Sequence, residues 1–118
     1  VNFSSVNAYI GVESQSLYCA CKAGIDLMTR AMARELAPYD VNINSIAPGA
    51  TRTPMNEALR TLPKHKGNLD AFVSNTPSNT TFSDPAEIAR MVVFLASDDA
   101  RPMHGSNVLM DEGLAAGI

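Results

Sequence analysis

One long helical pattern between two short apolar segments restricts the folds open to this chain. Apolar and small residues recur at helical spacing over residues 17–36, and Pro38 ends the pattern because the residue before a proline avoids the α conformation. The flanking residues 1–5 and 41–47 are typical of buried strands. Strand, helix and strand in this order form a right-handed parallel crossover unit. The sequence therefore predicts an α/β fold with a parallel sheet.

A second helix is predicted to begin after Asp84. Asp84 is a suitable N-cap, Pro85 suits the first helical position, and Glu87 completes a capping box. A buried stripe at helical spacing then follows, formed by Ile88, Met91, Val92 and Leu95. Residues 107–110 are predicted to form a last strand, so that the chain contributes three strands and two helices.

Residues 55–82 show no regular pattern and are predicted to form a long loop. Loops of this length in compact domains are usually functional or mobile. The loop contains the basic cluster Lys64, His65 and Lys66. This cluster could meet an anionic group of a substrate, although such clusters are more often solvated turns.

Tyr18 and Lys22 are four residues apart and should share one face of the first helix. A lysine ammonium beside the ring favours the phenolate, which would suit general acid–base chemistry near neutral pH. Ser5 could then supply a hydroxyl to the same substrate oxygen. The pair alone fits equally well an exposed helix with an ordinary aromatic residue and an ordinary lysine. Asp26 and Arg30, also four apart, are expected to pair on the exposed side of this helix.

Four motifs extend these observations over the whole chain: Val1-Asn2-Phe3-Ser4-Ser5-Val6, Tyr18-Cys19-Ala20-Cys21-Lys22-Ala23, Asn44-Ser45-Ile46-Ala47-Pro48-Gly49 with Thr53, and Met110-Asp111-Glu112-Gly113. In order and spacing they resemble the classical branch of the short-chain dehydrogenase/reductase family. The separation of Ser5 from Tyr18 matches that of the family and selects Ser5 over Ser4 as the catalytic serine. The resemblance implies the C-terminal half of a Rossmann-like doubly wound parallel sheet.

The resemblance also implies a hydride transfer between a nicotinamide cofactor, NAD or NADP, and a carbonyl or secondary alcohol. Tyr18 would be the general acid or base, Ser5 would bind the reacting oxygen, and Lys22 would bind the nicotinamide ribose. The implied cofactor-binding residues are Tyr18, Lys22, Pro48, Gly49, Thr51 and Thr53. Thr51 departs from the aliphatic residue usual in the family, and Thr53 could instead only prepare the turn at Pro54.

The glycine-rich phosphate loop of the family, of the form Thr-Gly-x-x-x-Gly-x-Gly, does not occur in these 118 residues. In family members that loop belongs to the N-terminal, cofactor-binding half. We therefore expect residues 1–118 to be the C-terminal catalytic and substrate-binding part of a single domain. The alternative is a truncated, non-catalytic fragment or interaction domain of the same fold.

Composition narrows the possible partners and compartment. A net charge of −3 argues against electrostatic binding of nucleic acid, and no apolar run approaches the about 20 residues that span a membrane. Cys19 and Cys21 lie two apart on a helix and point in different directions, so neither a disulfide nor a metal site is expected. Unpaired thiols favour a reducing, cytoplasmic location.

The resemblance implies a small-molecule alcohol or ketone substrate and a homodimer or homotetramer. The first helix has an unusually small-residue surface, formed by Ala20, Ala23, Gly24 and Ala31. Small side chains permit close backbone approach. The approaching element could be the sheet of the same chain or a helix of a partner subunit.

Overall fold

Three parallel strands form the centre of the molecule. The computed structural model describes residues 1–117. The sheet order is β1 (Asn2–Phe3), β2 (Ser45–Pro48), β3 (Asn107–Met110). Both strand pairs are parallel. The predicted parallel α/β sheet is confirmed, as is the position of the last strand.

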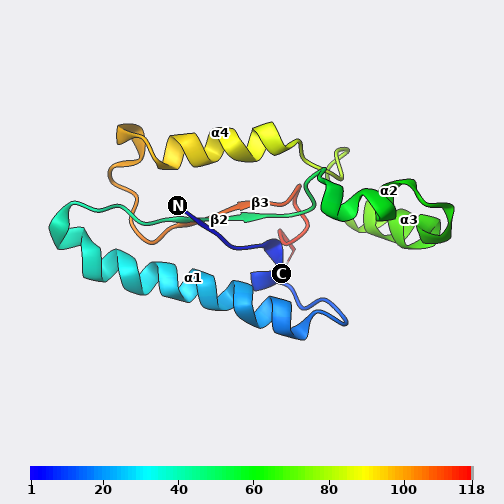
Figure 1. The fold of residues 1–118 in the computed structure, drawn as a ribbon, viewed down its shortest axis with the longest axis horizontal. Helices are drawn as coiled ribbons and strands as arrows, with labels where there is room; N and C mark the ends of the chain where they lie inside the picture. The colour runs from blue at the N-terminus through cyan, green and yellow to red at the C-terminus, as the bar shows by residue number, and fades with distance from the viewer. Residues whose placement is uncertain (118) are drawn as a thin grey trace.

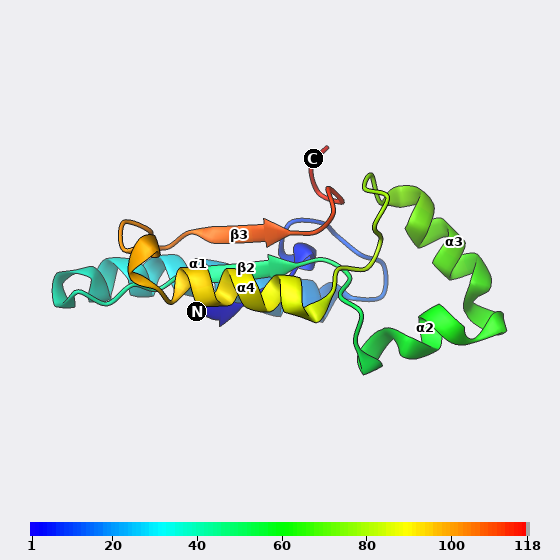
Figure 2. The same cartoon turned by 90° about the horizontal axis from the view of Figure 1, so that it is seen from above.

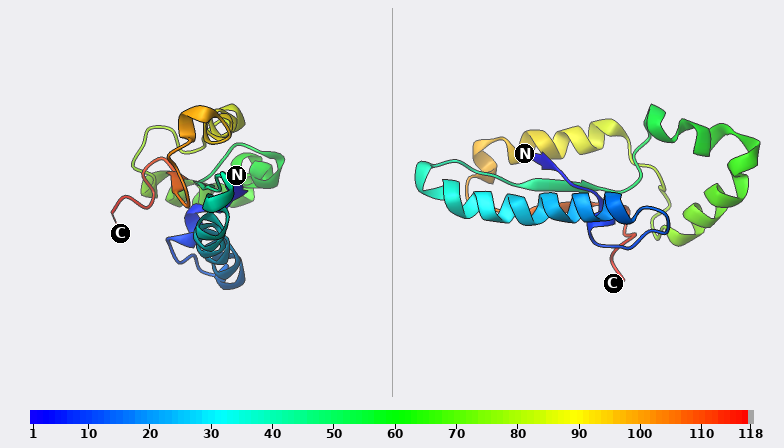
Figure 3. Two further views of the ribbon diagram at one scale, coloured as in Figure 1. Left: turned by 90° about the vertical axis from the view of Figure 1, so that its left-hand side faces the viewer. Right: turned by 60° about the horizontal axis from the view of Figure 1, so that its bottom comes forward.

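Helices cover the two faces of this sheet. Helix α1 (Ser16–Leu36) lies on one face and α4 (Pro85–Leu95) on the other, as Figures 1 and 3 show. The side chain of Ile46 is fully buried between these layers, and Ile88 and Leu95 of α4 are also buried. Both predicted helices are therefore confirmed, and Ile88 and Leu95 are the buried members of the predicted α4 stripe.

The start of α4 follows its sequence signals. The Asp84 carboxylate accepts a hydrogen bond from the Ala86 amide at 2.8 Å, and the Glu87 carboxylate accepts one from the Asp84 amide at 2.8 Å. Pro85 occupies the first helical position, where no amide hydrogen is needed. The predicted capping box is confirmed.

The predicted loop over residues 55–82 is wrong, because two further helices form there. Helices α2 (Glu57–Thr61) and α3 (Lys66–Asn75) form a splayed pair joined by a short turn, here called the hairpin, which projects beyond the carboxyl ends of the strands, as Figure 2 shows. The Phe72 ring packs against Phe82 at 5.7 Å between centroids. Arg60 donates to the Thr53 carbonyl at 3.1 Å. Each contact joins a helix residue to a residue outside that helix, so the helical spacing within either segment does not predict the hairpin.

Strand β2 begins later than predicted, at Ser45 rather than at Val41. Val41 is 43% exposed, and the ladder of paired residues begins only at Ser45, which pairs with Asn2 of β1 and Asn107 of β3. Polar contacts hold this segment instead. The Asn42 side-chain amide donates to the carbonyls of Ala100, Arg101 and Met103, and that of Asn44 donates to Met103.

The side of α1 that faces the sheet is partly polar. Ser45 donates to the carboxylate of Asp26 at 3.3 Å, and Asn2 donates to the Thr29 hydroxyl at 3.0 Å. Asp26 is only 8% exposed, so the predicted exposed pair with Arg30 is wrong.

The pKa of the Tyr9 phenol is raised above its ordinary value. Partial burial is the larger cause, and the nearby Asp26 carboxylate is the second.

The small-residue surface of α1 faces outward in this chain. Its alanines and glycine are exposed, and they lie among exposed apolar side chains, of which Leu17 is 83% and Leu27 is 68% exposed.

No helix within residues 1–117 is long and apolar enough to cross a membrane. Both cysteines are free thiols.

Candidate active site

The predicted site residues gather at the carboxyl edge of the sheet. Ser5 follows β1, Gly49 follows β2, and Asp111 follows β3. The carboxyl ends of parallel strands meet at one edge, which is where open α/β sheets bind ligands. The α2–α3 hairpin projects from this same edge.

Ser5 is held at the end of β1 by a short helical turn. It is the N-cap of the 3-10 helix η1 (Val6–Ala8), and its hydroxyl oxygen accepts a hydrogen bond from the Asn7 amide at 3.2 Å. Since that bond uses a lone pair, the hydroxyl hydrogen is left for another acceptor. The turn packs against α1, which carries the tyrosine and the lysine.

Tyr18 and Lys22 share one face of α1, as their spacing predicts. The Lys22 ammonium lies 5.6 Å from the centroid of the Tyr18 ring and donates to the Phe3 carbonyl at 3.0 Å. The Tyr18 side chain is 46% exposed. The phenol is thus open to a reactant, while the ammonium is fixed between the ring and the end of β1.

Ser4 has a different part from its neighbour. Its hydroxyl donates to the Lys22 carbonyl at 3.1 Å, and its side chain is 4% exposed. Ser4 therefore fastens α1 to β1 beside the lysine. No local sequence pattern predicts this hydrogen bond, because its partners are 18 residues apart.

A pocket of about 480 Å³ opens at the carboxyl edge of the sheet, on the α4 side. Its walls come from β1, the segment after β2, the start of the hairpin and α4: Phe3, Pro48, Gly49, Ala50, Thr51, Thr53, Met55, Asn56, Pro85, Ile88 and Ala89. The four predicted residues at and after the end of β2, which are Pro48, Gly49, Thr51 and Thr53, therefore line one pocket. Phe3 joins the two groups, since its side chain lines the pocket while its carbonyl receives the Lys22 ammonium.

Sequence reasoning missed Phe3, Met55 and Ile88 as pocket residues. They belong to three separate segments, and each is an ordinary apolar residue within its own pattern. Only the crossover topology brings them together.

Gly49 is required by a close approach between two chain segments. Its amide donates to the Met110 carbonyl at 2.8 Å. A Cβ atom at this position would lie 2.8 Å from the Asp111 Cα, closer than carbon atoms can pack. The glycine thus lets the ends of β2 and β3 meet under the pocket.

We expect Gly49→Ala to lower the free energy of unfolding by about 1–3 kcal/mol, because the added methyl group forces backbone apart. Gly67→Ala is the matched control. Gly67 lies in α3 with no atom within 4 Å of its added Cβ, so alanine should stabilise by up to about 1 kcal/mol. Chemical denaturation measures both variants. Equal stability of the two proteins would contradict the packing role of Gly49.

Thr51 and Thr53 also have structural contacts. Thr51 forms an isolated parallel bridge with Ser83. Thr53 precedes the turn at Pro54 and forms a capping box with Asn56, whose side-chain oxygen accepts from the Thr53 amide at 3.3 Å. The alternative that Thr53 prepares the turn at Pro54 therefore has direct support. Thr53 also lines the pocket.

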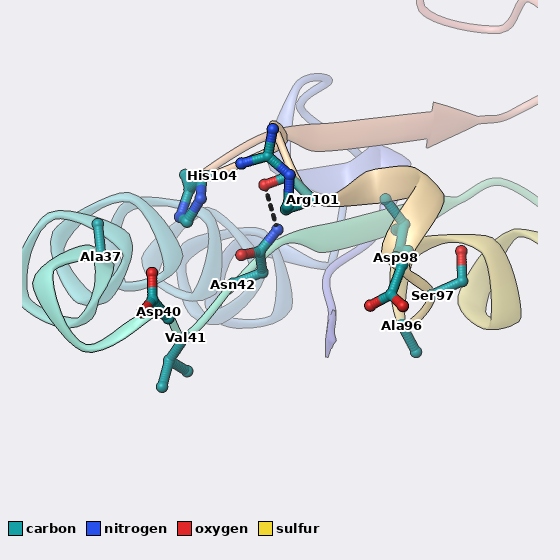
Figure 4. A pocket seen from close by; sticks show the side chains of 10 residues that line it. Ala37, Asp40, Val41, Asn42, Ala96, Ser97, Asp98, Arg101 and His104 are labelled. Atoms are coloured by element: carbon teal, nitrogen blue, oxygen red, sulfur yellow. Dashed lines mark hydrogen bonds between the residues drawn. The ribbon is translucent and has the colours of Figure 1, made fainter.

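A larger hollow, of about 620 Å³, lies at the opposite, amino edge of the sheet. Figure 4 shows its lining, which includes Asp40, Asn42, Arg101 and His104. It contains none of the predicted site residues. Within residues 1–117, no three histidine, cysteine or acidic side chains are grouped as metal ligands.

Comparisons with known proteins identify the family of this chain. A family model described as enoyl-(acyl carrier protein) reductase matches residues 1–115. The cyclopentanol dehydrogenase of Comamonas sp. is 34% identical over 98% of this chain, and the levodione reductase of Leifsonia aquatica is 39% identical over 98%. The 3-oxoacyl-(acyl-carrier-protein) reductase of Thermotoga maritima is 37% identical over 97%.

Solved structures share the fold. A 4-hydroxyisoleucine dehydrogenase complexed with NADH superposes with a TM-score of 0.90 at 30% identity, covering 99% of this chain and 46% of that one. The structure of a levodione reductase gives 0.89 at 36% identity, covering 99% and 46%. The three curated relatives are matched over only 44–45% of their lengths, so this chain spans less than half of each. The chain belongs to the classical short-chain dehydrogenase/reductase family.

Proposed function

We propose that this chain supplies the catalytic residues of an oxidoreductase that transfers hydride between a nicotinamide cofactor and a carbonyl or secondary alcohol. The observation that carries the proposal is one juxtaposition. A capped serine hydroxyl, an exposed phenol and a fixed ammonium lie at the edge of the sheet where an apolar pocket opens. The names of the relatives, all dehydrogenases or reductases, support the same chemistry.

The pocket beside Phe3 fits the nicotinamide end of NAD or NADP. Phe3, Pro48 and Ile88 offer apolar walls to a flat ring, and Thr51 and Thr53 are the hydroxyl-bearing residues of its lining. The Lys22 ammonium, which donates to the carbonyl of the pocket residue Phe3, would hold the ribose hydroxyls. When bound, the cofactor supplies or accepts the hydride. A solved relative in complex with NADH supports a nicotinamide cofactor.

The side chains have distinct parts in the proton transfer. In reduction the Tyr18 phenol gives its proton to the substrate oxygen, and in oxidation it takes that proton back. The positive charge of Lys22 stabilises the phenolate that remains. The free hydrogen of the Ser5 hydroxyl is donated to the same substrate oxygen, where negative charge develops.

We also propose that the protein acts as a homodimer or homotetramer in the cytoplasm. The exposed small-residue surface of α1, with Leu17 and Leu27, is the contact that we assign to a second copy. Its apolar side chains would favour burial, and its alanines would allow two helices to approach closely.

The test is a substrate screen with the full-length protein. Cyclic alcohols, sugars and 3-oxoacyl thioesters are offered with each of NAD and NADP in both oxidation states, and nicotinamide absorbance is followed. Turnover of a secondary alcohol or ketone is the expected result. A protein that binds neither cofactor and turns over none of these compounds would instead favour the alternative, a non-catalytic interaction domain.

A further inference from the structure

Glu112, in the turn after β3, has a backbone conformation that is unfavourable for its residue type. Its φ angle is 58°, in the left-handed region that favours glycine. The turn is fastened by Asp111, whose carboxylate accepts from the amides of Gly113 at 3.0 Å and Ala115 at 2.7 Å. A glutamate at this position is therefore less stable than a glycine would be. What the glutamate adds is its carboxylate, which glycine lacks.

The Glu112 carboxylate bonds to a buried hydroxyl at the base of the helical hairpin. Ser83 is 4% exposed and donates to the carboxylate oxygen at 2.9 Å. Hydrogen bonds to an ionised acceptor are stronger than those between neutral groups. The Glu112 carbonyl also accepts from the Ser78 amide at 3.1 Å. One residue thus holds the returning stem of the hairpin, residues 76–83, at two points.

Ser83 is in turn hydrogen-bonded through its backbone to the segment that lines the pocket. Its amide donates to the Ala50 carbonyl at 3.0 Å, and its carbonyl accepts from the Arg52 amide at 2.9 Å. These two bonds enclose Thr51, which faces Ser83 in the isolated bridge and lines the pocket. The chain of contacts therefore runs from Glu112 through Ser83 to the wall where we place the nicotinamide.

We propose that Glu112 is a positioning residue for the cofactor-binding segment, residues 50–52. Its carboxylate fixes the Ser83 hydroxyl, and Ser83 in turn fixes the backbone on both sides of Thr51. This inference rests on the proposed function for its kinetic consequence, whereas the anchoring itself does not depend on any activity.

The test compares Glu112→Gly, Glu112→Gln and Ser83→Ala in the full-length protein. Glycine relieves the left-handed strain, but it also leaves the buried Ser83 hydroxyl without its acceptor, so the two effects oppose each other and Glu112→Gly should melt near the wild-type temperature. Its Ser83 and Arg52 amides should nevertheless exchange with deuterium about tenfold faster, because their anchor is lost. The KM for the cofactor should rise about tenfold, with kcat changed by less than about threefold. Ser83→Ala should show the same exchange and kinetic changes.

Two controls separate positioning from general stability. Glu112→Gln keeps an acceptor oxygen for Ser83, so it should remain within about threefold of wild type in exchange and in KM. Asp40 also has a φ angle of 58° and lies at the opposite edge of the sheet, so Asp40→Gly relieves the same backbone strain away from the pocket. It should raise stability without changing the cofactor KM.

Three results would overturn the proposal. The first is wild-type exchange at Ser83 and Arg52 in Glu112→Gly. The second concerns the double variant Glu112→Gly with Ser83→Ala. If its fold-changes in exchange rate and in cofactor KM equal the product of the fold-changes in the two single variants, the two residues act separately. The third is an unchanged cofactor KM in an active protein. If the wild-type protein turned over no substrate, the proposed function would fail, and the exchange rates would still decide whether Glu112 anchors the stem.

Discussion

Replacing Tyr18 with phenylalanine is expected to lower kcat by about 10²- to 10⁴-fold, the usual contribution of a positioned acid or base. Phenylalanine keeps the ring beside the Lys22 ammonium and removes only the hydroxyl that exchanges a proton with the substrate. The side chain is 46% exposed, so the change leaves no buried polar partner behind. Cofactor affinity should stay within about twofold of wild type, because the ribose contacts belong to Lys22.

Steady-state rates and a cofactor titration of the full-length protein measure these two effects separately. Tyr39→Phe is the matched control, since Tyr39 is 75% exposed and lies in the turn after α1 at the opposite edge of the sheet. It should leave both quantities unchanged. Turnover above about a tenth of wild type in Tyr18→Phe would contradict the acid–base role.

The helices that could be predicted are those whose ends are specified by their own residues. Asp84, Pro85 and Glu87 satisfy the first amides of α4 without help from elsewhere in the chain. Pro38 similarly marks the end of α1, which gives way to a 3-10 turn at residue 37. Signals of this kind act within four residues, so a sequence contains them in full.

Helices α2 and α3 could not be predicted, because tertiary contacts stabilise them. Much of their surface is exposed, so neither has the apolar stripe that marks a helix packed on a sheet. Instead, Phe72 packs on Phe82, and Arg60 bonds to the Thr53 carbonyl. Both partners lie outside the helices concerned.

Asp26 shows how a neighbouring strand can reverse a local expectation. Four residues from Arg30 on a helix, it resembles half of a surface ion pair. Burial of a carboxylate is tolerated where polar partners are provided, and here the Ser45 hydroxyl of β2 provides one. The identity of the residue opposite Asp26 depends on the register of the sheet, which no helical pattern contains.

The site also contains features that local sequence spacing predicts and features that depend on tertiary packing. Helical spacing alone brings Tyr18 and Lys22 together, and the structure agrees. The need for glycine at position 49 depends instead on Asp111, which lies 62 residues away, directly after the next strand. The motif identified Gly49, and only the packing of two strands explains it.

Replacing Lys22 with methionine is expected to weaken cofactor binding and slow turnover together, unlike the change at Tyr18. Methionine keeps an unbranched apolar stem and removes the ammonium that lies 5.6 Å from the Tyr18 ring. Loss of charged hydrogen bonds to the ribose should raise the cofactor Kd by about 10- to 100-fold. Loss of the charge beside the phenolate should lower kcat by at least about tenfold as well.

Lys22→Arg distinguishes the charge from the geometry. Arginine keeps the positive charge but presents a planar fork in place of a compact ammonium, so it should recover part of kcat and little of the cofactor affinity. Fluorescence titration with the cofactor and pre-steady-state rates measure the two losses. Thermal melting checks the fold, since the Phe3 carbonyl that loses its donor at 3.0 Å lies where water can replace it. Wild-type cofactor affinity in a folded Lys22→Met protein would mean that the ammonium serves β1 and the tyrosine alone, and the ribose would then need another partner.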